Sequence, residues 1–396
     1  MFVNFRRSWG AWILVLSMIG AFIALGIKPV GGHYHSFAGA ARLAWAGSNP
    51  FGIPFAGGIF FYSPAAAYFY GLFAFLPDSL GQFLYVAFGT ALFFWALFQL
   101  LAAVRDTLGY DITRAAGASL FWIMVSSEVT GAIGAMKLEI WLAGFSMWAF
   151  ALLLRGHHPA LAGALLGIGS QWKFQPIPLF GLALVVLLWD RAWKRFVAGY
   201  LGMIAVLAAM PLVLLPWATV VEWYAKWWQV LAHYTDKAWL APIYQHVFRF
   251  THVWGFTPTR SQANFFTVSV ALGLAVGLGV WCSRRGRGKP VLEGLLAALA
   301  LGSLFITTLS PHTQSNGYIL YLPALPAVWY FAVRRASHVK AVLGLIAVCY
   351  FFISISYSDL VPRDFYHWVY DHALKPVAAW ALAALLVRGM LKARAA

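Results

Sequence analysis

Charged residues are scarce in this chain. Asp, Glu, Lys and Arg make up 10% of its 396 residues, whereas soluble domains carry about a quarter. Hydrophobic residues make up 62%, and the mean hydropathy is +0.75. A water-soluble fold of this length could not bury so much apolar surface. The composition excludes a soluble protein and predicts an all-α, polytopic membrane protein, with residues 1–396 forming a single integral-membrane domain.

Cysteine and the common soluble-enzyme motifs are also lacking. The two cysteines, Cys282 and Cys349, lie in or beside apolar segments and show no metal spacing and no disulfide framework, so we interpret them as core residues. The chain has no P-loop, dinucleotide fingerprint, HExxH motif or nucleophile elbow. It also lacks a carboxylate cluster that could hold a metal, and we predict neither a metal nor another cofactor.

Acidic residues are outnumbered: 12 Asp and Glu stand against 28 Lys and Arg, a formal net charge of +16. Such an excess could indicate nucleic-acid binding. The basic residues cluster between apolar segments, however, which is the pattern of short cytoplasmic loops in membrane proteins. We therefore predict no nucleic-acid partner.

Apolar segments of membrane-spanning length recur along the chain. They lie at 9–27, 80–104, 114–133, 138–155, 195–216, 264–282, 290–309, 317–333, 340–357 and 374–391. The apolar stretch 158–189 is too long for one helix and is interrupted by polar residues at 171–176, which predicts two short helices meeting at a hinge. The total is about twelve spans.

The stretch 28–79 is too long for a simple connector. It holds an Ala-rich helical run ending at Gly47 and a second apolar helix opened by Tyr62-Ser63-Pro64, which predicts a folded first external loop with juxtamembrane helices. If the helix at 60–76 does not cross the membrane, most basic residues fall on one face. The positive-inside rule then makes that face, and both termini, cytoplasmic.

This orientation places the long loops 28–79, 217–263 and 358–373 outside the cell or in the periplasm. Any chemistry then lies on the outer face of an inner (plasma) membrane. The second long loop, 217–263, is rich in Trp and Tyr, which is typical of an interfacial aromatic belt or of a wall on which a sugar stacks.

Several polar side chains interrupt the apolar segments on that outer side. Lys137 and Glu139 lie between two spans and could form a local ion pair. Lys173, with Gln175 beside it in the hinge, is costly near hydrocarbon unless it faces water or an anion. With His312, in the turn after Ser310, these groups could form a cationic site for a lipid phosphate.

His33 and His35 are the candidate bases, because an unperturbed histidine titrates near neutral pH. They are two residues apart, so in an extended segment their side chains point opposite ways and one of them enters a site.

Four stretches carry a resemblance to a known family: 33–51, 60–77, 152–180 and 309–326. In order and spacing they are similar to the polyprenyl-phosphate-dependent membrane glycosyltransferases of the GT-C superfamily, specifically glycosyltransferase family eighty-seven, the bacterial mannosyltransferase-like group. The resemblance implies a GT-C-like fold and a glycosyltransferase. Its donor would be a polyprenyl-phosphate-linked mannose, other hexose or pentose, its acceptor a glycolipid or glycan, and membrane lipids would surround it.

The same resemblance implies roles for individual residues. The family opens its first external loop with an aspartate that deprotonates the acceptor, and this chain has His33 at or near that place, with His35 as the second candidate. The resemblance matches Tyr62, Lys173 and His312 to motifs of the family, whereas the segment around Lys137 departs from the family pattern. Together with the polar residues noted above, the expected substrate-binding residues are Tyr62, Lys137, Glu139, Lys173, Gln175 and His312. The missing aspartate leaves open a catalytically degenerate protein that binds lipid-linked sugar. A third possibility is a lipid or sugar-lipid transporter, which would need a polar path reaching both faces.

Overall fold

The computed structural model describes residues 8–27, 30–56, 58–237, 246–284, 288–310, 315–354 and 362–392. Within them the chain is almost entirely helical. In chain order the elements are α2 (Trp9–Ile27), α3 (Gly32–Trp45), β1 (Pro54–Phe55), β2 (Gly58–Ile59), α4 (Pro64–Ala74), α5 (Asp78–Leu108), η1 (Ile112–Arg114), α6 (Ala118–Gly134), α7 (Glu139–Leu154), α8 (Pro159–Trp172), α9 (Ile177–Leu187), α10 (Trp193–Ala209), η2 (Met210–Val213), α11 (Trp217–Lys237), α12 (Val247–Val253), α13 (Arg260–Ser283), α14 (Lys289–Leu309), η3 (Ser315–Ala324), α15 (Leu325–Val328), η4 (Trp329–Val333), α16 (Val339–Ser354), α17 (Arg363–Asp371) and α18 (Lys375–Lys392). Strands β1 and β2, of two residues each, pair antiparallel in the first loop.

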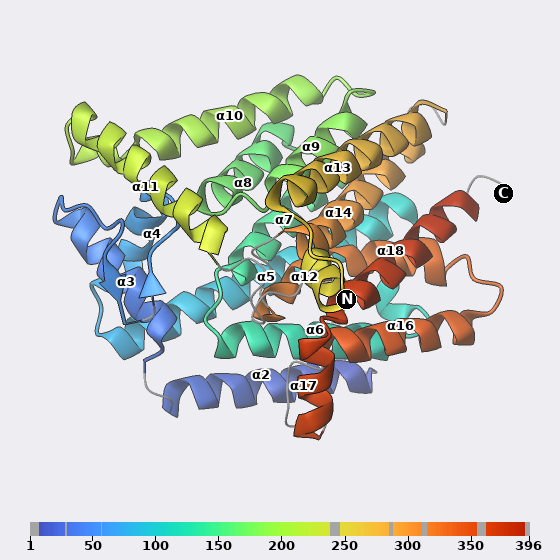
Figure 1. Ribbon diagram of the computed structural model, residues 1–396. Helices are drawn as coiled ribbons and strands as arrows, with labels where there is room; N and C mark the ends of the chain where they lie inside the picture. The colour runs from blue at the N-terminus through green and yellow to red at the C-terminus, as the bar shows by residue number, and fades with distance from the viewer. Residues whose placement is uncertain are drawn as a thin grey trace.

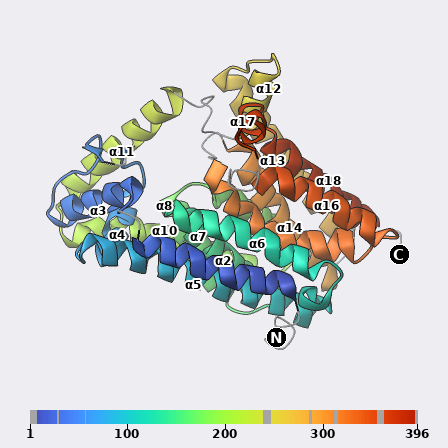
Figure 2. The same cartoon turned by 90° about the horizontal axis from the view of Figure 1, so that it is seen from below.

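The long helices run back and forth between two ends of the molecule. One end carries α3, α4 and α11, which lie together at the left of Figures 1 and 2. Helix α5 begins there and ends at Leu108, whose carbonyl oxygen accepts a 3.5 Å hydrogen bond from Nη1 of Arg334 at the far end. The helix α4 both begins and ends near the first end, because Tyr62 before it and Asp78 after it contact α3. This agrees with the prediction that 60–76 does not cross.

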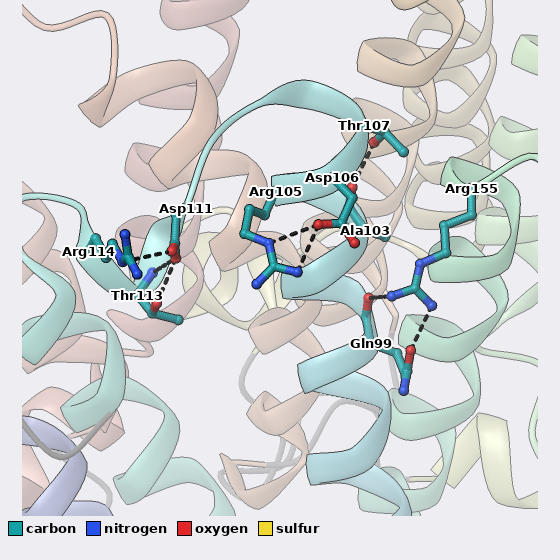
Figure 3. Close-up of polar contacts among 9 residues, drawn as sticks. All are labelled: Gln99, Ala103, Arg105, Asp106, Thr107, Asp111, Thr113, Arg114 and Arg155. Atoms are coloured by element: carbon teal, nitrogen blue, oxygen red, sulfur yellow. Dashed lines mark hydrogen bonds and ion pairs between the residues drawn. The ribbon is translucent and has the colours of Figure 1, made fainter. Parts of the chain in front are cut away.

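Basic residues gather at the far end, as the loop charges predicted. Figure 3 shows Arg105 bonded to Asp106 through a 2.8 Å contact and Arg155 donating from Nη1 to Oε1 of Gln99 at 2.6 Å. Arg155 directly follows α7. The first residue of that helix, Glu139, lies at the opposite end of the molecule, where it contacts Lys173 at the end of α8.

Five of the described helices are long and apolar enough to cross a membrane: α2, α5, α10 with η2, α13, and α14 from Val291. The other apolar helices are 10–17 residues long. The membrane class is therefore confirmed, and the total of about twelve spans stays a prediction.

Burial separates the central helix from those at the periphery. In an apolar stretch of 18 residues taken from each helix, 94% of the stretch is buried in α14, compared with 11% in α13, 17% in α10 and 22% in α2. Because the exposed faces of these outer helices are apolar, they are suited to contact lipid rather than water. Helix α14 thus connects the two ends through the core.

Small residues let α8 and α10 pack closely. A Cβ atom placed on Gly199 would lie 1.9 Å from the Ala160 carbonyl oxygen, and one on Gly163 would lie 2.0 Å from that of Phe196. Gly163 and Gly167 form a GxxxG pattern on α8, a spacing that brings membrane helices into backbone contact. This contact fixes α8, and with it the hinge that follows.

The predicted segment 317–333 is not one regular helix. It is a 3-10 helix (η3), one α-turn (α15) and a π-helix (η4) in succession. Pro323 and Pro326 lie within it, and a proline removes one backbone donor and clashes with the preceding turn.

Candidate active site

A cavity of about 480 Å³ opens at the end of the molecule that carries α3 and α11, and residues of both helices line it. This volume is in the range of about 300–1,000 Å³ that ligand pockets occupy. Six of the eight predicted site residues line it: His33, Tyr62, Lys137, Glu139, Lys173 and Gln175. Segments separated by more than a hundred residues in the sequence therefore meet in one place.

Helix α3 is held beside the cavity by bonds to its neighbours. The Gly31 N–H donates to Oε1 of Gln82 on α5 at 2.8 Å, and the Tyr34 hydroxyl donates to the Phe73 carbonyl on α4 at 3.0 Å. The ring of Phe37 stacks on Tyr70 with the centroids 4.4 Å apart. These contacts orient the first turn of α3, which carries His33.

The two histidines face different sides, although the segment that carries them is not extended as expected from the sequence. Both lie in helix α3 and not in an extended segment, because good helix formers follow them as far as Trp45. Two residues apart on a helix, they face different sides. His33 lines the cavity, whereas Nδ1 of His35 lies 3.7 Å from Oδ2 of Asp78 outside it, and the His35 side chain is 38% exposed.

Glu139 and Lys173 form a close ion pair at the floor of the cavity. Lys173 Nζ donates to Glu139 Oε1 at 2.6 Å, and both side chains are largely buried. Lys173 has extended backbone angles (φ −156°, ψ 134°) that end α8, and Pro176 leads into α9. These residues form the predicted hinge.

The sequence suggested a local ion pair of Glu139 with Lys137. The structure adds Lys173, at the end of α8, as a partner of Glu139.

Lys137 reaches the cavity through a tight reversal. The preceding residue, Met136, has a φ of +51°, in the left-handed region, and this turns the chain between α6 and α7. Lys137 is 8% exposed, and burial lowers its pKa, while Glu139 raises it and Lys173 lowers it. Two lysines thus share one carboxylate.

Oxygen atoms in the cavity retain hydrogen-bonding capacity. Within the part of the chain that the structure describes, Oε2 of Glu139 and Oε1 of Gln175 are buried and meet no hydrogen-bond partner. Buried polar atoms are nearly always bonded in folded proteins. Acceptors of this kind are suited to hydroxyl groups of a ligand.

The surroundings of His33 favour its neutral form. Burial lowers the pKa of His33 below its usual 6.5, the positive charges of Lys137 and Lys173 lower it further, and Glu139 opposes them. The side chain is solvent-accessible through the open cavity, yet protein atoms surround it on the other sides. A neutral imidazole at physiological pH can accept a proton.

The remaining walls are mostly apolar. Phe305, Ile306 and Leu309 of α14 form one side, and Trp227 of α11 forms another. The Trp227 indole N–H donates to the Phe61 carbonyl at 3.0 Å, so α11 is tied to the first external loop.

Sequence reasoning missed Arg260, which also lines the cavity. It is the first residue of α13, which Thr259 caps. A cation at a helix N-terminus is electrostatically unfavourable. The charge beside the capping threonine can be seen in the sequence, but its position in the cavity cannot.

His312 lies outside the described residues, although Ser310 just before it lines the cavity. Tyr62 lines the cavity as well, and its ring stacks on that of Phe61 with the ring centroids 5.1 Å apart. Among the described residues, no group of three or more His, Cys, Asp or Glu side chains could hold a metal ion.

The family described as glycosyltransferase family 87 matches residues 60–311, which is more than half of the chain. The chain belongs to glycosyltransferase family 87. The resemblance inferred from the sequence is confirmed, and this family 87 member is a membrane glycosyltransferase.

Solved structures of ArnT from Cupriavidus metallidurans are similar to the family 87 chain. The structure bound to undecaprenyl phosphate shares 18% identity at a TM-score of 0.41, covering 97% of this chain and 77% of ArnT. The apo structure shares 17% identity at a TM-score of 0.41, covering 96% and 77%. A search of curated proteins found no match.

Proposed function

We propose that the chain transfers a sugar from a polyprenyl-phosphate donor to an acceptor hydroxyl group, and that the reaction takes place in the cavity described above. The observation that carries this proposal is the meeting of His33, Glu139 and two lysines in one cavity whose other walls are mostly apolar. A lipid-linked sugar needs both environments, since its phosphate is anionic and its chain is hydrocarbon.

The cationic side of the cavity would bind the phosphate. Lys137, Lys173 and Arg260 bring three positive charges against the single negative charge of Glu139. In a site largely shielded from water, preorganised cations stabilise a leaving phosphate strongly. Glu139 holds Lys173 in place through the 2.6 Å contact and keeps the lysine oriented before the donor arrives.

The apolar wall on α14 would receive the start of the polyprenyl chain. Leu309 is four residues after Phe305 and three after Ile306, spacings that bring side chains together on a helix surface, and all three line the cavity. Trp227 of α11 also lines the cavity and offers an aromatic ring of the kind on which sugar rings stack.

His33 would act as the general base. The acceptor oxygen attacks the anomeric carbon and forms the new glycosidic bond, while the bond from that carbon to the phosphate oxygen breaks. The hydroxyl proton passes to His33, and the electron pair of the broken bond leaves with the polyprenyl phosphate, whose charge the lysines neutralise. The lowered pKa of His33 keeps the imidazole ready to accept that proton.

The cavity would face the periplasm or the cell exterior. It lies at the end of the bundle opposite Arg105, Arg155 and Arg334. Arg155 and Arg334 both donate hydrogen bonds to α5, the helix that carries Arg105. The positive-inside rule assigns that basic end to the cytoplasm. The sugar is mannose or another hexose or pentose in this proposal, and the acceptor is a glycolipid or glycan.

The test is a transfer assay with the purified full chain and a panel of polyprenyl-phosphate sugars, following release of polyprenyl phosphate and formation of glycoside. We expect His33→Ala to lower the transfer rate by about 10²-fold or more with donor binding unchanged. His35→Ala is the matched control, because its side chain lies outside the cavity, and it should keep the wild-type rate.

Two results would count against the proposal. Full activity in His33→Ala with loss in Glu139→Gln would move the base to the carboxylate, whose Oε2 meets no partner among the described residues. Binding of every donor in the panel without bond cleavage, with a range of acceptors present, would indicate a lipid-sugar binding protein.

A further inference from the structure

A second cavity, of about 210 Å³, opens at the far end of the molecule between the segment after η4, α16 and α18. Glu293, in the first turns of α14, contacts this region, whereas Leu309 at the other end of α14 lines the sugar-transfer cavity. At 1.5 Å per residue the two positions are about 24 Å apart. The second cavity is therefore separate from the first.

The lining of this second cavity is strongly basic. Arg335, His338, Arg388 and Lys392 all line it, and none of its described lining residues is acidic. Arg388 and Lys392 are four residues apart on α18, so they lie on one helix face, where like charges repel each other. An anion between them would remove that repulsion.

Arg335 is fixed in place with a hydrogen-bond donor to spare. Its Nη2 donates to Oε1 of Glu293 at 3.0 Å, and the Tyr330 hydroxyl donates to the same oxygen at 2.6 Å. The guanidinium also lies over the rings of Tyr330 and Phe331, 5.3 Å from each centroid. Its Nη1 is buried and has no acceptor among the described residues. A planar guanidinium of this kind is well suited to a phosphate oxygen.

The rest of the cavity is apolar and reaches the lipid-facing surface. Val342, Leu345 and Leu385 line it, and Leu345 is 44% exposed. Basic pockets between membrane helices that continue into an apolar surface bind anionic lipid headgroups. The π-helix η4, which ends two residues before Arg335, is a rare conformation that is frequent at functional sites.

We propose that this second cavity binds a phosphate group, held by Arg335, Arg388 and Lys392, on the face opposite the sugar-transfer site. The phosphate is carried either by an anionic lipid or by a free anion. In both cases the basic side chains bind the phosphate. Only a lipid would also fill the apolar part of the cavity with its hydrocarbon chains.

The test is a calorimetric titration of the purified full chain in maltoside micelles. The ligands are dioctanoyl phosphatidic acid, inorganic phosphate and, as the zwitterionic control, dioctanoyl phosphatidylcholine. We expect phosphatidic acid to bind and the double variant Arg388→Gln/Lys392→Gln to weaken its binding at least tenfold. Both side chains are exposed, so the variant should fold as the wild type does.

Two further variants give the controls. Arg105→Gln removes a charge at the same end, outside the cavity, so it should not change this binding. Lys173→Gln removes a charge from the sugar-transfer cavity, so binding that this variant loses and the double variant keeps belongs to the first cavity and not to the second. Phosphatidic acid binding alone supports a lipid source, and binding of inorganic phosphate that the double variant weakens supports a free anion. The proposal would be overturned if the double variant bound each ligand as tightly as the wild type does. It would also be overturned if Arg105→Gln weakened binding as much as the double variant does.

Discussion

The ion pair between Glu139 and Lys173 can be tested without knowing the substrate. The change is Lys173→Met, which keeps the length of the side chain and removes its charge. The Glu139 carboxylate then loses its 2.6 Å partner while the residue remains 5% exposed. A buried charge deprived of its partner is costly, so the free energy of unfolding should fall.

The expected loss is about 3 kcal/mol, the lower end of the range for breaking one side of a buried ion pair. We take the lower end because the Lys173 side chain is 18% exposed and because Lys137 stays near the carboxylate. Glu139→Gln should also destabilise, since it leaves the two lysines facing each other. The double variant removes both charges and should lose less than the sum of the single losses, with a coupling of about 2 kcal/mol.

The measurement is unfolding in mixed micelles with increasing SDS, followed by the fluorescence of the 20 tryptophans. Lys226→Met on the exposed face of α11 is the matched control and should change stability by less than about 0.5 kcal/mol. A Lys173→Met protein as stable as this control, or additive losses in the double variant, would refute the ion pair as a stabilising contact.

Other predictions concern the base and the helix packing. Because the pKa of His33 is lowered, kcat/KM should fall with decreasing pH only below its usual 6.5, where the imidazole becomes protonated. Glu139→Gln removes the charge that raises this pKa, so this acidic limb should move to lower pH; an unchanged limb would show that another group titrates. Gly199→Ala should destabilise the protein by about 1–3 kcal/mol in the same unfolding assay, because the new methyl group clashes with the backbone of α8. Gly202→Ala, with nothing within 4 Å of the added atom, is its control, and equal effects of the two changes would show that the close approach of the helices is unimportant.

Much of the fold was readable from local patterns. The segment predicted at 9–27 is helix α2, and the hinge predicted at 171–176 separates α8 from α9. Such features depend on residues close in sequence. The length of an apolar run determines whether a helix can span the membrane, and a proline after a polar stretch interrupts the helix at that point. The irregular helix at 317–333 was not predicted, because apolar composition does not distinguish an α-helix from 3-10 and π turns.

The candidate site was only partly readable. Polar residues in apolar surroundings identified Lys137, Glu139 and Lys173, because such residues are costly in a membrane. Their pairing was not readable, and neither was the presence of Arg260 in the same cavity. An ion pair between residues 34 positions apart depends on how α7 packs against the end of α8.

The sequence by itself therefore determined that this is a helical membrane protein of glycosyltransferase family 87, and it located several of its helices. These properties follow from composition, local periodicity and short-range breaks. The tertiary structure alone decided that His33 and not His35 lines the cavity and that Lys173 pairs with Glu139. Both depend on contacts between helices distant in the chain, which close packing sets and local sequence does not encode.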